Sequence, residues 1–349
     1  MTLLELPEEI LYIISAYISA RDRVALLSAS RTCSQSFEPI HYRQDAHSTN
    51  PSALIWASGN GKIQSLKKAI TASDNVHLLR GVDGRRPLSL VAKAGHELAL
   101  ELLLAIEGSD PNERDYHGQT PLSLSSLMGH TGVVKLLLSV SGINPDPIDN
   151  YGRSALSLAA EAGQVSVVEL LLGIEGVDVD SRDDDLQSPF WFAIGEAHKE
   201  VVNLLIGTGM VDVGMTDSEG NTPLTWAAWK GNLDMVELLL TTKGANPSSR
   251  NNKGQTALTV ASIKGNEAIV KLLIATEGID PDSKDDSGST PLLFAASEGH
   301  EAVVKVLLQT GRVDNNHVND NGNTAVGEAL WNRHLNIVEL LNDWNDGRS

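Results

Sequence analysis

The sequence predicts an all-α solenoid in which short helical units stack one on the next. A bulky apolar residue recurs every 34 residues, without a slip, over nine units. A fixed period of this size is the sequence signature of stacked repeats. Aromatic residues make up only 4% of the chain, so the core is expected to consist of Leu, Val, Ile and Ala in thin, closely packed helices. The recurring anchors are Leu54, Leu88, Leu122, Leu156, Phe190, Leu224, Leu258, Leu292 and Val326.

Composition and charge limit the kinds of partner. The chain has 349 residues, of which 41% are hydrophobic and 21% charged, as is typical of folded proteins. Its net charge is -18, and only four basic and six acidic side chains lie in the first fifty residues. Because such a negative field repels phosphate, neither nucleic acid nor an anionic membrane is an expected partner. Two explanations of the charge stay open, namely solubility alone or an acidic docking patch.

The single cysteine and the N-terminal residues bear on the compartment. Cys33 is alone, so no disulfide can form within the chain, which favours the cytoplasm or the nucleus. Glu5, Glu8 and Glu9 lie where a signal peptide would carry positive charge. The apolar run from Ile10 to Ala20 is about half of the roughly 20 residues that span a bilayer. A soluble chain in the cytoplasm or the nucleus is therefore expected.

The unit around Leu224 shows the order of parts within one repeat. It consists of Gly220-Asn221-Thr222-Pro223-Leu224, then Ala227-Ala228, then Gly231-Asn232, and then the ladder from Val236 to Leu240. This order resembles the ankyrin pattern Gly-x-Thr-Pro-Leu, Ala-Ala, Gly-His, Val-Val-x-Leu-Leu, and the resemblance covers about 300 residues. It implies an array of helix pairs that binds other proteins on a concave face formed by finger turns and first helices.

The first helix of each unit has a marked start and end. In the Thr-Pro step the Thr hydroxyl caps free amides, and Pro at the first helical position costs no hydrogen bond. The Ala pair keeps the helix thin, and a glycine ends it in a left-handed turn. The Thr-Pro steps are Thr120-Pro121, Thr222-Pro223 and Thr290-Pro291, and the ending glycines are Gly95, Gly129, Gly163, Gly231, Gly265 and Gly299.

The second helix and the finger turn complete the unit. Apolar ladders such as Val134 to Leu138 predict a second helix buried on one side. The extra residue relative to a unit of about 33 residues falls in the loop that follows, at Ile106-Glu107-Gly108. Aspartates seven residues before the anchor are predicted to accept hydrogen bonds from finger-turn amides. They are Asp115, Asp149, Asp183, Asp217 and Asp285.

The prediction is of about nine units, eight of them recognisable and a degenerate one around Leu54 at the N-terminus. Three units deviate from the common residue pattern, and the unit around Leu54 is the first of them. The last unit, around Val326, is predicted to be a C-terminal cap with a polar outer face. Inside the array, Leu186 and Ala197 stand where other units have glycine, and Phe190 replaces the leucine anchor. Two interpretations of this unit stay open, namely compensated packing and a hinge.

The first forty-five residues form a separate segment. Leu6-Pro7-Glu8-Glu9-Ile10-Leu11 is followed by apolar residues at helical spacing and then by a second segment that begins at Asp22. This order resembles an F-box, which implies binding to the Skp-type adaptor of a cullin ubiquitin ligase. The implied adaptor contacts are Leu6, Pro7, Ile10, Leu11, Ile14, Leu26 and Leu27. The chain then divides into an F-box-like segment, residues 1–45, and a repeat array, residues 46–349. Alternatively, the segment is only a helical cap on the solenoid.

The sequence predicts neither a catalytic, cofactor nor metal site. Five of the ten histidines occupy one register position, directly after the end of the first helix, which indicates a structural role. They are His96, His130, His198, His300 and His334. Gly59 to Lys62 resembles a phosphate loop, but Ile63 stands where Ser or Thr would hold magnesium. The protein is therefore not expected to be an enzyme.

The register also predicts which residues face a partner. Trp229 is the most informative, because Trp226 is assigned to the core and Trp229 should then face the groove. Contact of Trp229 with an adjacent finger is an equally open alternative. Trp56, Phe192 and Phe294 share the register position of Trp226 and are also assigned to the core. The predicted client-binding residues are Tyr116, Leu127, Met128, Tyr151, Arg153, Trp229, Lys230, Ile263 and Trp331.

Two hypotheses of function follow. The first is the substrate-recruiting subunit of a Skp–cullin–F-box ubiquitin ligase, which holds a client protein on its repeats and an adaptor at its N-terminus. The second is a plain ankyrin scaffold or inhibitory binding protein with a helical N-terminal cap and no ubiquitin role. In either case the protein by itself is expected to be a monomer.

Overall fold

The computed structural model describes residues 57–72, 80–81, 83–345 and 347. The F-box-like segment, the anchor Leu54 and Trp56 lie outside the described residues, so the predictions made for them stay predictions. Within the described residues all regular elements are α-helices, and the β-structure is limited to one isolated bridge between Ile148 and Ser154. Among the described helices, none is long and apolar enough to cross a membrane.

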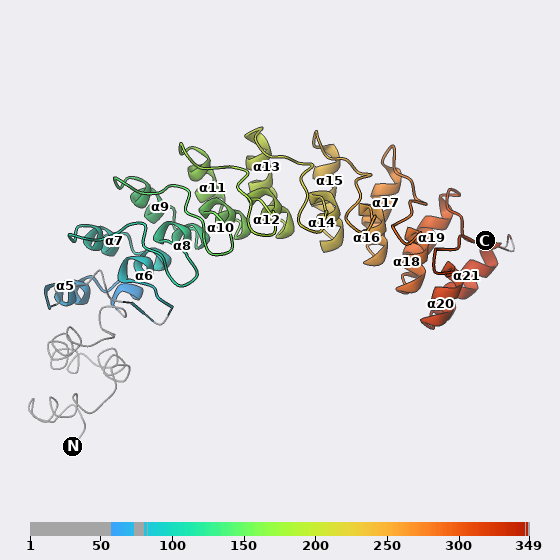
Figure 1. Cartoon of the computed structure of the whole chain (residues 1–349), viewed down its shortest axis with the longest axis horizontal. Coiled ribbons are helices and arrows are strands. Elements are labelled where there is room, and N and C mark those ends of the chain that lie inside the picture. Colours follow the sequence, from blue (N-terminus) through green and yellow to red (C-terminus); the bar gives the residue numbers. More distant parts are fainter. Residues whose placement is uncertain (1–56, 73–79, 82, 346, 348–349) are drawn as a thin grey trace, which may run out of the picture. The chain divides into compact units, whose positions relative to one another are not determined.

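The chain divides into two compact units, Met1–Ser181 and Arg182–Ser349. In the first unit (Figure 1), α5 precedes three helix pairs, and first helices α6, α8 and α10 pack in sequence, as do second helices α7, α9 and α11. The bounds are α5 Ile63–Ala72, α6 Pro87–Ala94, α7 Glu97–Leu104, α8 Pro121–Leu127, α9 Thr131–Leu138, α10 Ala155–Glu161 and α11 Val165–Leu172.

The second unit repeats the same arrangement. First helices α12, α14, α16, α18 and α20 pack in sequence, and each contacts the second helix of its own pair. The bounds are α12 Pro189–Gly195, α13 Lys199–Gly207, α14 Pro223–Lys230, α15 Leu233–Thr241, α16 Ala257–Ile263, α17 Glu267–Ala275, α18 Pro291–Ser297, α19 Glu301–Gln309, α20 Ala325–Trp331 and α21 Leu335–Asn345. The all-helical repeat architecture is as predicted, whereas the count of nine stays a prediction because the first unit begins outside the described residues.

The predicted caps and turns are present. Thr120, Thr222 and Thr290 each accept a hydrogen bond from the amide three residues on, at 3.2 to 3.3 Å, and a proline follows each of them. The six helix-ending glycines all have φ between 67° and 82°. The alanine pairs are fully buried, which lets neighbouring first helices approach closely. These alanines are Ala159, Ala160, Ala227, Ala228, Ala295 and Ala296.

The finger aspartates and three of the five register histidines make structural hydrogen bonds, as predicted. Asp149 Oδ1 accepts from the amides of Tyr151 and Arg153, both at 2.9 Å, and Asp115, Asp183, Asp217 and Asp285 hold their own turns in the same way. His130, His300 and His334 each place Nε2 2.9 to 3.1 Å from a carbonyl oxygen of the preceding repeat. The described residues contain no group of three or more His, Cys, Asp or Glu that could hold a metal ion.

Helix α6 begins differently from the other first helices. Its N-cap residue, Arg86, has no side-chain oxygen to offer. Glu113, from the next finger, instead accepts from the amide of Ser89 at 3.1 Å and from its hydroxyl at 2.8 Å. Burial raises the pKa of Glu113 to about 7, against the opposing effects of the Ser89 hydrogen bonds and of Arg86. The helix is thus capped by a carboxyl group that titrates near neutral pH.

The assignment of the Trp226 register position to the core was wrong. Trp226, Phe192 and Phe294 are all only partly buried. Most aliphatic residues at the same position are covered, since Leu158 is 1% and Val260 4% exposed, whereas Leu90 is partly buried. The position therefore lies at the edge of the core, where most aliphatic side chains are buried but a larger ring extends beyond its neighbours.

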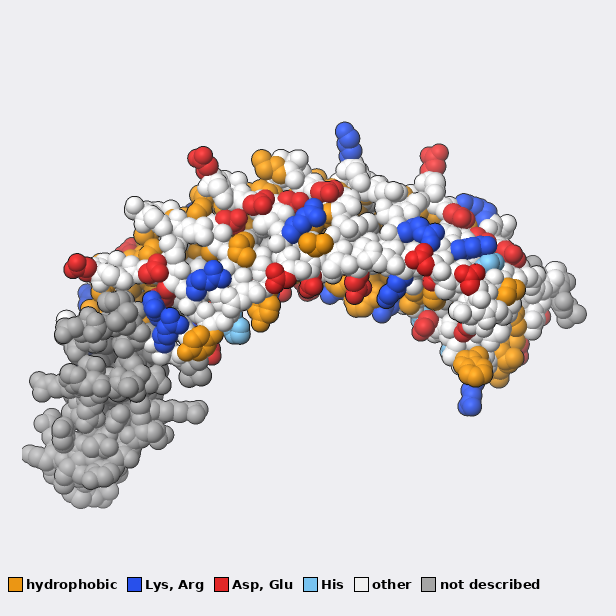
Figure 2. All heavy atoms as spheres, in the orientation of Figure 1, with side chains coloured by type: hydrophobic (Ala, Val, Ile, Leu, Met, Phe, Trp, Pro, Cys, Tyr) orange, Lys and Arg blue, Asp and Glu red, His pale blue; other side chains and the backbone are white. Residues whose placement is uncertain are grey.

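The expectation of a polar outer face on the last unit was also wrong in part. Leu330 and Leu335 are 58% and 61% exposed. Leu330 occupies the position at which inner repeats have Ala228 or Ala296, both fully buried by the following repeat. In the described part of the chain no helix pair follows α20 and α21, so this stacking surface is uncovered. Apolar side chains accordingly gather near the α20 end of the second unit in Figure 2.

The degenerate repeat keeps the backbone of its neighbours. Leu186 and Ala197 have φ of 64° and 65°, in the left-handed region that glycine occupies elsewhere. Phe190 and Trp191 are at most 1% exposed, so the larger side chains of α12 are packed inside the second unit. The proposed hinge is a statement about motion and stays a prediction.

Candidate binding groove

A groove in the second unit combines aromatic, basic and amide side chains. A cavity of about 250 Å³ lies between two finger turns, helix α14 and helix α16. The fingers contribute polar side chains, α14 contributes two tryptophans, and α16 contributes Val260. The lining residues are Glu219, Asn221, Thr225, Trp226, Trp229, Asn251, Lys253, Gln255 and Val260.

The tryptophans of α14 form a stacked pair. Trp226 and Trp229 lie three residues apart and so share one helix face. Their ring centroids are 5.2 Å apart and their planes differ by 7°. The buried Trp191 of α12 contacts Trp226, with ring centroids 6.0 Å apart. Trp229 remains 45% exposed, so the pair presents an apolar surface to solvent on a supported base.

Lysines lie over both rings. Lys264 Nζ is 4.4 Å from the centroid of Trp229, and Lys230 Nζ is 5.4 Å from that of Trp226. Such cation–π contacts contribute about 0.5–1 kcal/mol each at exposed sites. Lys230 also lies 3.5 Å from Glu196 Oε1. The groove is therefore basic as well as aromatic, in a chain whose net charge is strongly negative.

The finger wall of the groove is held by side-chain amides. Asn251 Nδ2 donates to Asn221 Oδ1 at 2.9 Å, and Asn221 Nδ2 donates to Asp217 Oδ2 at 3.1 Å. Asn251 Oδ1 also accepts from the amides of Lys253 and Gln255. These bonds join two successive fingers, so the wall is fixed before any partner arrives.

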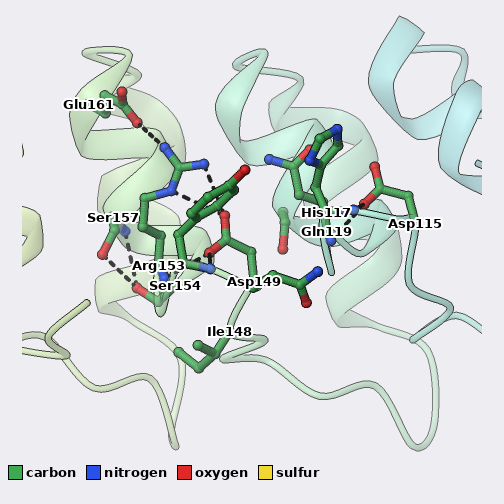
Figure 3. A network of polar contacts seen from close by, with 12 residues as sticks. Asp115, His117, Gln119, Ile148, Asp149, Arg153, Ser154, Ser157 and Glu161 are labelled. Atoms are coloured by element: carbon green, nitrogen blue, oxygen red, sulfur yellow. Dashed lines mark hydrogen bonds and ion pairs between the residues drawn. The ribbon is translucent and has the colours of Figure 1, made fainter. Parts of the chain in front are cut away.

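The first unit presents a different set of predicted residues. Tyr116, Tyr151 and Met128 are 62%, 54% and 42% exposed, whereas Leu127 is partly buried. Arg153 is not free, because its guanidinium bonds to Asp149 and Glu161 (Figure 3) and lies 5.3 Å from the centre of the Tyr151 ring. It is therefore an ordering element of its finger, and a partner would meet the Tyr151 ring that it supports.

The predicted residues are thus only partly brought together. In the second unit Trp229 and Lys230 both contact Trp226 at the groove. Ile263 is partly buried at the end of α16, and Trp331 is 85% exposed on α20. Sequence reasoning missed Trp226 and Lys264 as groove residues. The spacing of Trp226 and Trp229 on one helix was a signal for the first, but the position of Lys264 depends on how the next repeat stacks.

Surface charge favours solubility over a single acidic patch on the face shown in Figure 2. Acidic and basic side chains are interspersed there over both units. The described ion pairs include Arg153 with Glu161, Arg250 with Asp286 and Lys271 with Glu267. Such mixed surfaces keep a protein soluble without presenting a large field of one sign.

Stacked helix pairs joined by finger turns define a helical-repeat binding protein, and comparison with known families specifies which. A family model described as "Ankyrin repeats (3 copies)" matches residues 54–149, 88–183, 156–251, 190–285 and 258–346. The chain therefore belongs to the ankyrin-repeat family. The ankyrin repeat domain of Bcl-3, described as a unique member of the IkappaB protein family, is similar, with 30% identity and a TM-score of 0.55. That match covers 65% of this chain and 99% of the Bcl-3 chain.

The family membership defines the broad class of function. Ankyrin repeats form protein–protein interaction modules, and the fold is typically non-enzymatic. A comparison with curated proteins yields no match.

Proposed function

We propose that the protein binds a client protein in the groove of the second unit, with Trp229 as the main contact. The observation that carries this proposal is the Trp226–Trp229 stack, in which Trp226 also contacts the buried Trp191 and Trp229 is 45% exposed. Tryptophans that are rigid before binding lose little entropy on contact and are enriched among the residues that dominate binding energy. Tyr116, Met128 and Tyr151 of the first unit are proposed as additional client contacts.

Capture by the full chain tests this proposal. Wild-type protein, Trp229→Ala and Met210→Ala are immobilised at equal density, and captured proteins are quantified by mass spectrometry. Met210 is 70% exposed in the same unit but does not line the groove, so it is a matched control. The client should be lost with Trp229→Ala and retained with Met210→Ala. If every captured protein is retained by Trp229→Ala, and circular dichroism shows all three proteins folded, the groove is not the client site.

We further propose that residues 1–45 bind a Skp-type adaptor, so that the client is presented to a cullin ubiquitin ligase in the cytoplasm or the nucleus. The support is the Leu-Pro-x-Glu-Ile start and the helical spacing that follows it. The alternative is a plain scaffold or inhibitory binding protein, in which the segment only covers the first repeat.

Size-exclusion chromatography of the full chain with a purified Skp-type adaptor separates these alternatives. A complex is expected with the wild type and should be lost with Ile10→Asp/Ile14→Asp, because charges on the apolar helix face oppose packing on the adaptor. If the folded wild-type chain forms no complex, the ligase role is excluded and the scaffold alternative remains.

A further inference from the structure

The size of the groove cavity suits side chains better than a whole small molecule. Its volume is about 250 Å³. Pockets that enclose small-molecule ligands usually span about 300–1,000 Å³ and have mostly apolar walls. This cavity has a mixed wall, with Trp226, Trp229 and Val260 on the helix side and amide and charged groups on the finger side. It suits one or two side chains of a longer segment better than an enclosed small molecule.

The charge around the cavity favours an acidic segment. Lys253 lines it, and Lys264 and Lys230 lie over its tryptophans. Against these three lysines stand Glu219, which lines the cavity, and Glu196, which is paired with Lys230. Within the part of the chain that the structure describes, no carboxylate forms an ion pair with Lys253 or Lys264. These two ammonium groups are therefore available to carboxylates of a partner.

The finger wall offers a hydrogen-bonding group for a peptide backbone. The side-chain amides of Asn221 and Asn251 are used within the wall. Gln255 also lines the cavity, and its side-chain amide makes no hydrogen bond to the described residues. An amide supplies both donors and an acceptor, which matches the alternating groups of an extended backbone.

From these three observations we infer that the groove binds an extended acidic peptide segment of a partner protein. A bulky apolar side chain of that segment enters the cavity against Trp229, and flanking Asp or Glu side chains pair with Lys253 and Lys264. Lys264 is exposed, so its ammonium can turn to a carboxylate while its methylene stem stays on the ring. This inference rests on the proposed function, because it specifies the chemistry of the client at the same groove.

The probe is a displayed library of random twelve-residue peptides, selected on the immobilised full-length chain. Enriched peptides are synthesised with a fluorescent label, and their affinities are measured by fluorescence polarisation. Asp or Glu next to a large aliphatic or aromatic residue should be enriched. Affinity should fall at least about tenfold with Trp229→Ala, as is usual for residues that dominate an interface.

A pair of matched double variants isolates the charge. Lys253→Gln/Lys264→Gln should weaken binding about three- to tenfold, since each exposed ion pair contributes about two- to threefold in affinity. Lys243→Gln/Lys284→Gln removes the same charge from exposed positions of the second unit that do not line the cavity, and should leave affinity unchanged. Added salt should weaken binding of the wild type more than that of the Lys253→Gln/Lys264→Gln variant.

The possible failures are distinct. Enriched peptides that depend on Trp229 but lack acidic residues, or that bind the Lys253→Gln/Lys264→Gln variant equally well, overturn the acidic preference and leave the client groove intact. Peptides whose binding survives Trp229→Ala contradict the groove itself and with it the proposed function. A selection that yields no binder overturns the extended-peptide inference alone, because the capture experiment tests the groove with whole proteins.

Discussion

Replacing Ala197 by glycine is expected to stabilise the second unit. Ala197 ends α12 with φ of 65°, whereas the six helix-ending glycines have φ between 67° and 82°. A residue with a Cβ in this region costs about 1–2 kcal/mol relative to the right-handed region. The greater conformational freedom of glycine in the unfolded chain disfavours folding and offsets about 0.4–1 kcal/mol of the strain that is relieved. The expected net gain is therefore about 0.5–1 kcal/mol.

Gly231 is the equivalent of Ala197 one repeat further on, and it shows how the following asparagine packs where no Cβ is present. Asn266 lies against Gly231, where an added Cβ would be 3.1 Å from Asn266 Oδ1, and its Nδ2 donates to the carbonyl of Ala228 at 3.0 Å. Asn232 holds the same position after Ala197, but its Oδ1 accepts from the amide of Met235 at 3.4 Å. Glycine at 197 gives Asn232 room to bond to α12 instead. Exchanging one hydrogen bond for another is close to neutral, so the backbone gain decides the result.

Hydrogen exchange by mass spectrometry is the appropriate assay, because repeat arrays open locally and need not unfold in one step. A gain of 0.5–1 kcal/mol corresponds to an increase of about two- to fivefold in protection of α12 and α13. Gly231→Ala is the opposite control and should lower protection of α14, since the new Cβ is both strained and crowded. Unchanged or reduced protection in Ala197→Gly, together with the expected loss in Gly231→Ala, would refute the reasoning. The wild-type data also test the hinge, which requires residues 186–205 to exchange faster than the neighbouring repeats.

Three further outcomes are expected. Because the pKa of Glu113 is raised, its ionised form is disfavoured in the folded state, so its contribution to stability is present below about pH 4.5 and is lost as pH rises through about 7. Glu113→Gln keeps an acceptor for Ser89 and should remove a loss on the order of 3 kcal/mol between pH 5 and 8, measured as the protection of α6 in hydrogen exchange after correction for intrinsic rates; equal pH slopes in both proteins would contradict this. Thr222→Ala should lower the protection of α14 by about 1 kcal/mol in hydrogen exchange, and no change would mean that the cap is dispensable. His300→Ala should reduce protection at the junction of α16 and α18 by about 1 kcal/mol, whereas His300→Asn should retain part of it, since an asparagine makes the equivalent bond in another repeat.

The register predicted most of the backbone because the same local chemistry recurs in every unit. A Thr before the first helix, an Asp in the finger and a glycine at the helix end act on amides or dihedrals a few residues away, so their roles can be derived from spacing alone. The inter-repeat bonds of His130 and His300 were predictable only as structural, since their carbonyl partners lie 37 residues earlier in the chain.

The errors occurred where the size or the neighbour of a side chain decides the outcome. The register assigns Trp226 and Val260 to one face, but only the geometry of the stack shows that a valine is covered there and an indole is not. Two contacts were missed because the residue that makes them belongs to the next repeat. They are the ammonium of Lys264 over the Trp229 ring and the carboxyl of Glu113 that accepts a hydrogen bond from Ser89. Such contacts depend on the spacing and tilt of adjacent helix pairs, which a repeat period does not specify.

The face of α20 and α21 that no described helix pair covers offers a site for engineering. Leu330 lies where each inner repeat receives the next one, and it is 58% exposed. A consensus ankyrin unit fused in register after residue 345 would meet a surface already shaped for stacking, and a terminal unit with a polar outer side would restore solubility. Lengthening the array in this way would leave Trp226, Trp229 and their lysines untouched. The length of the array and the residues of the binding groove could then be varied independently, which makes the second unit a modular recognition element.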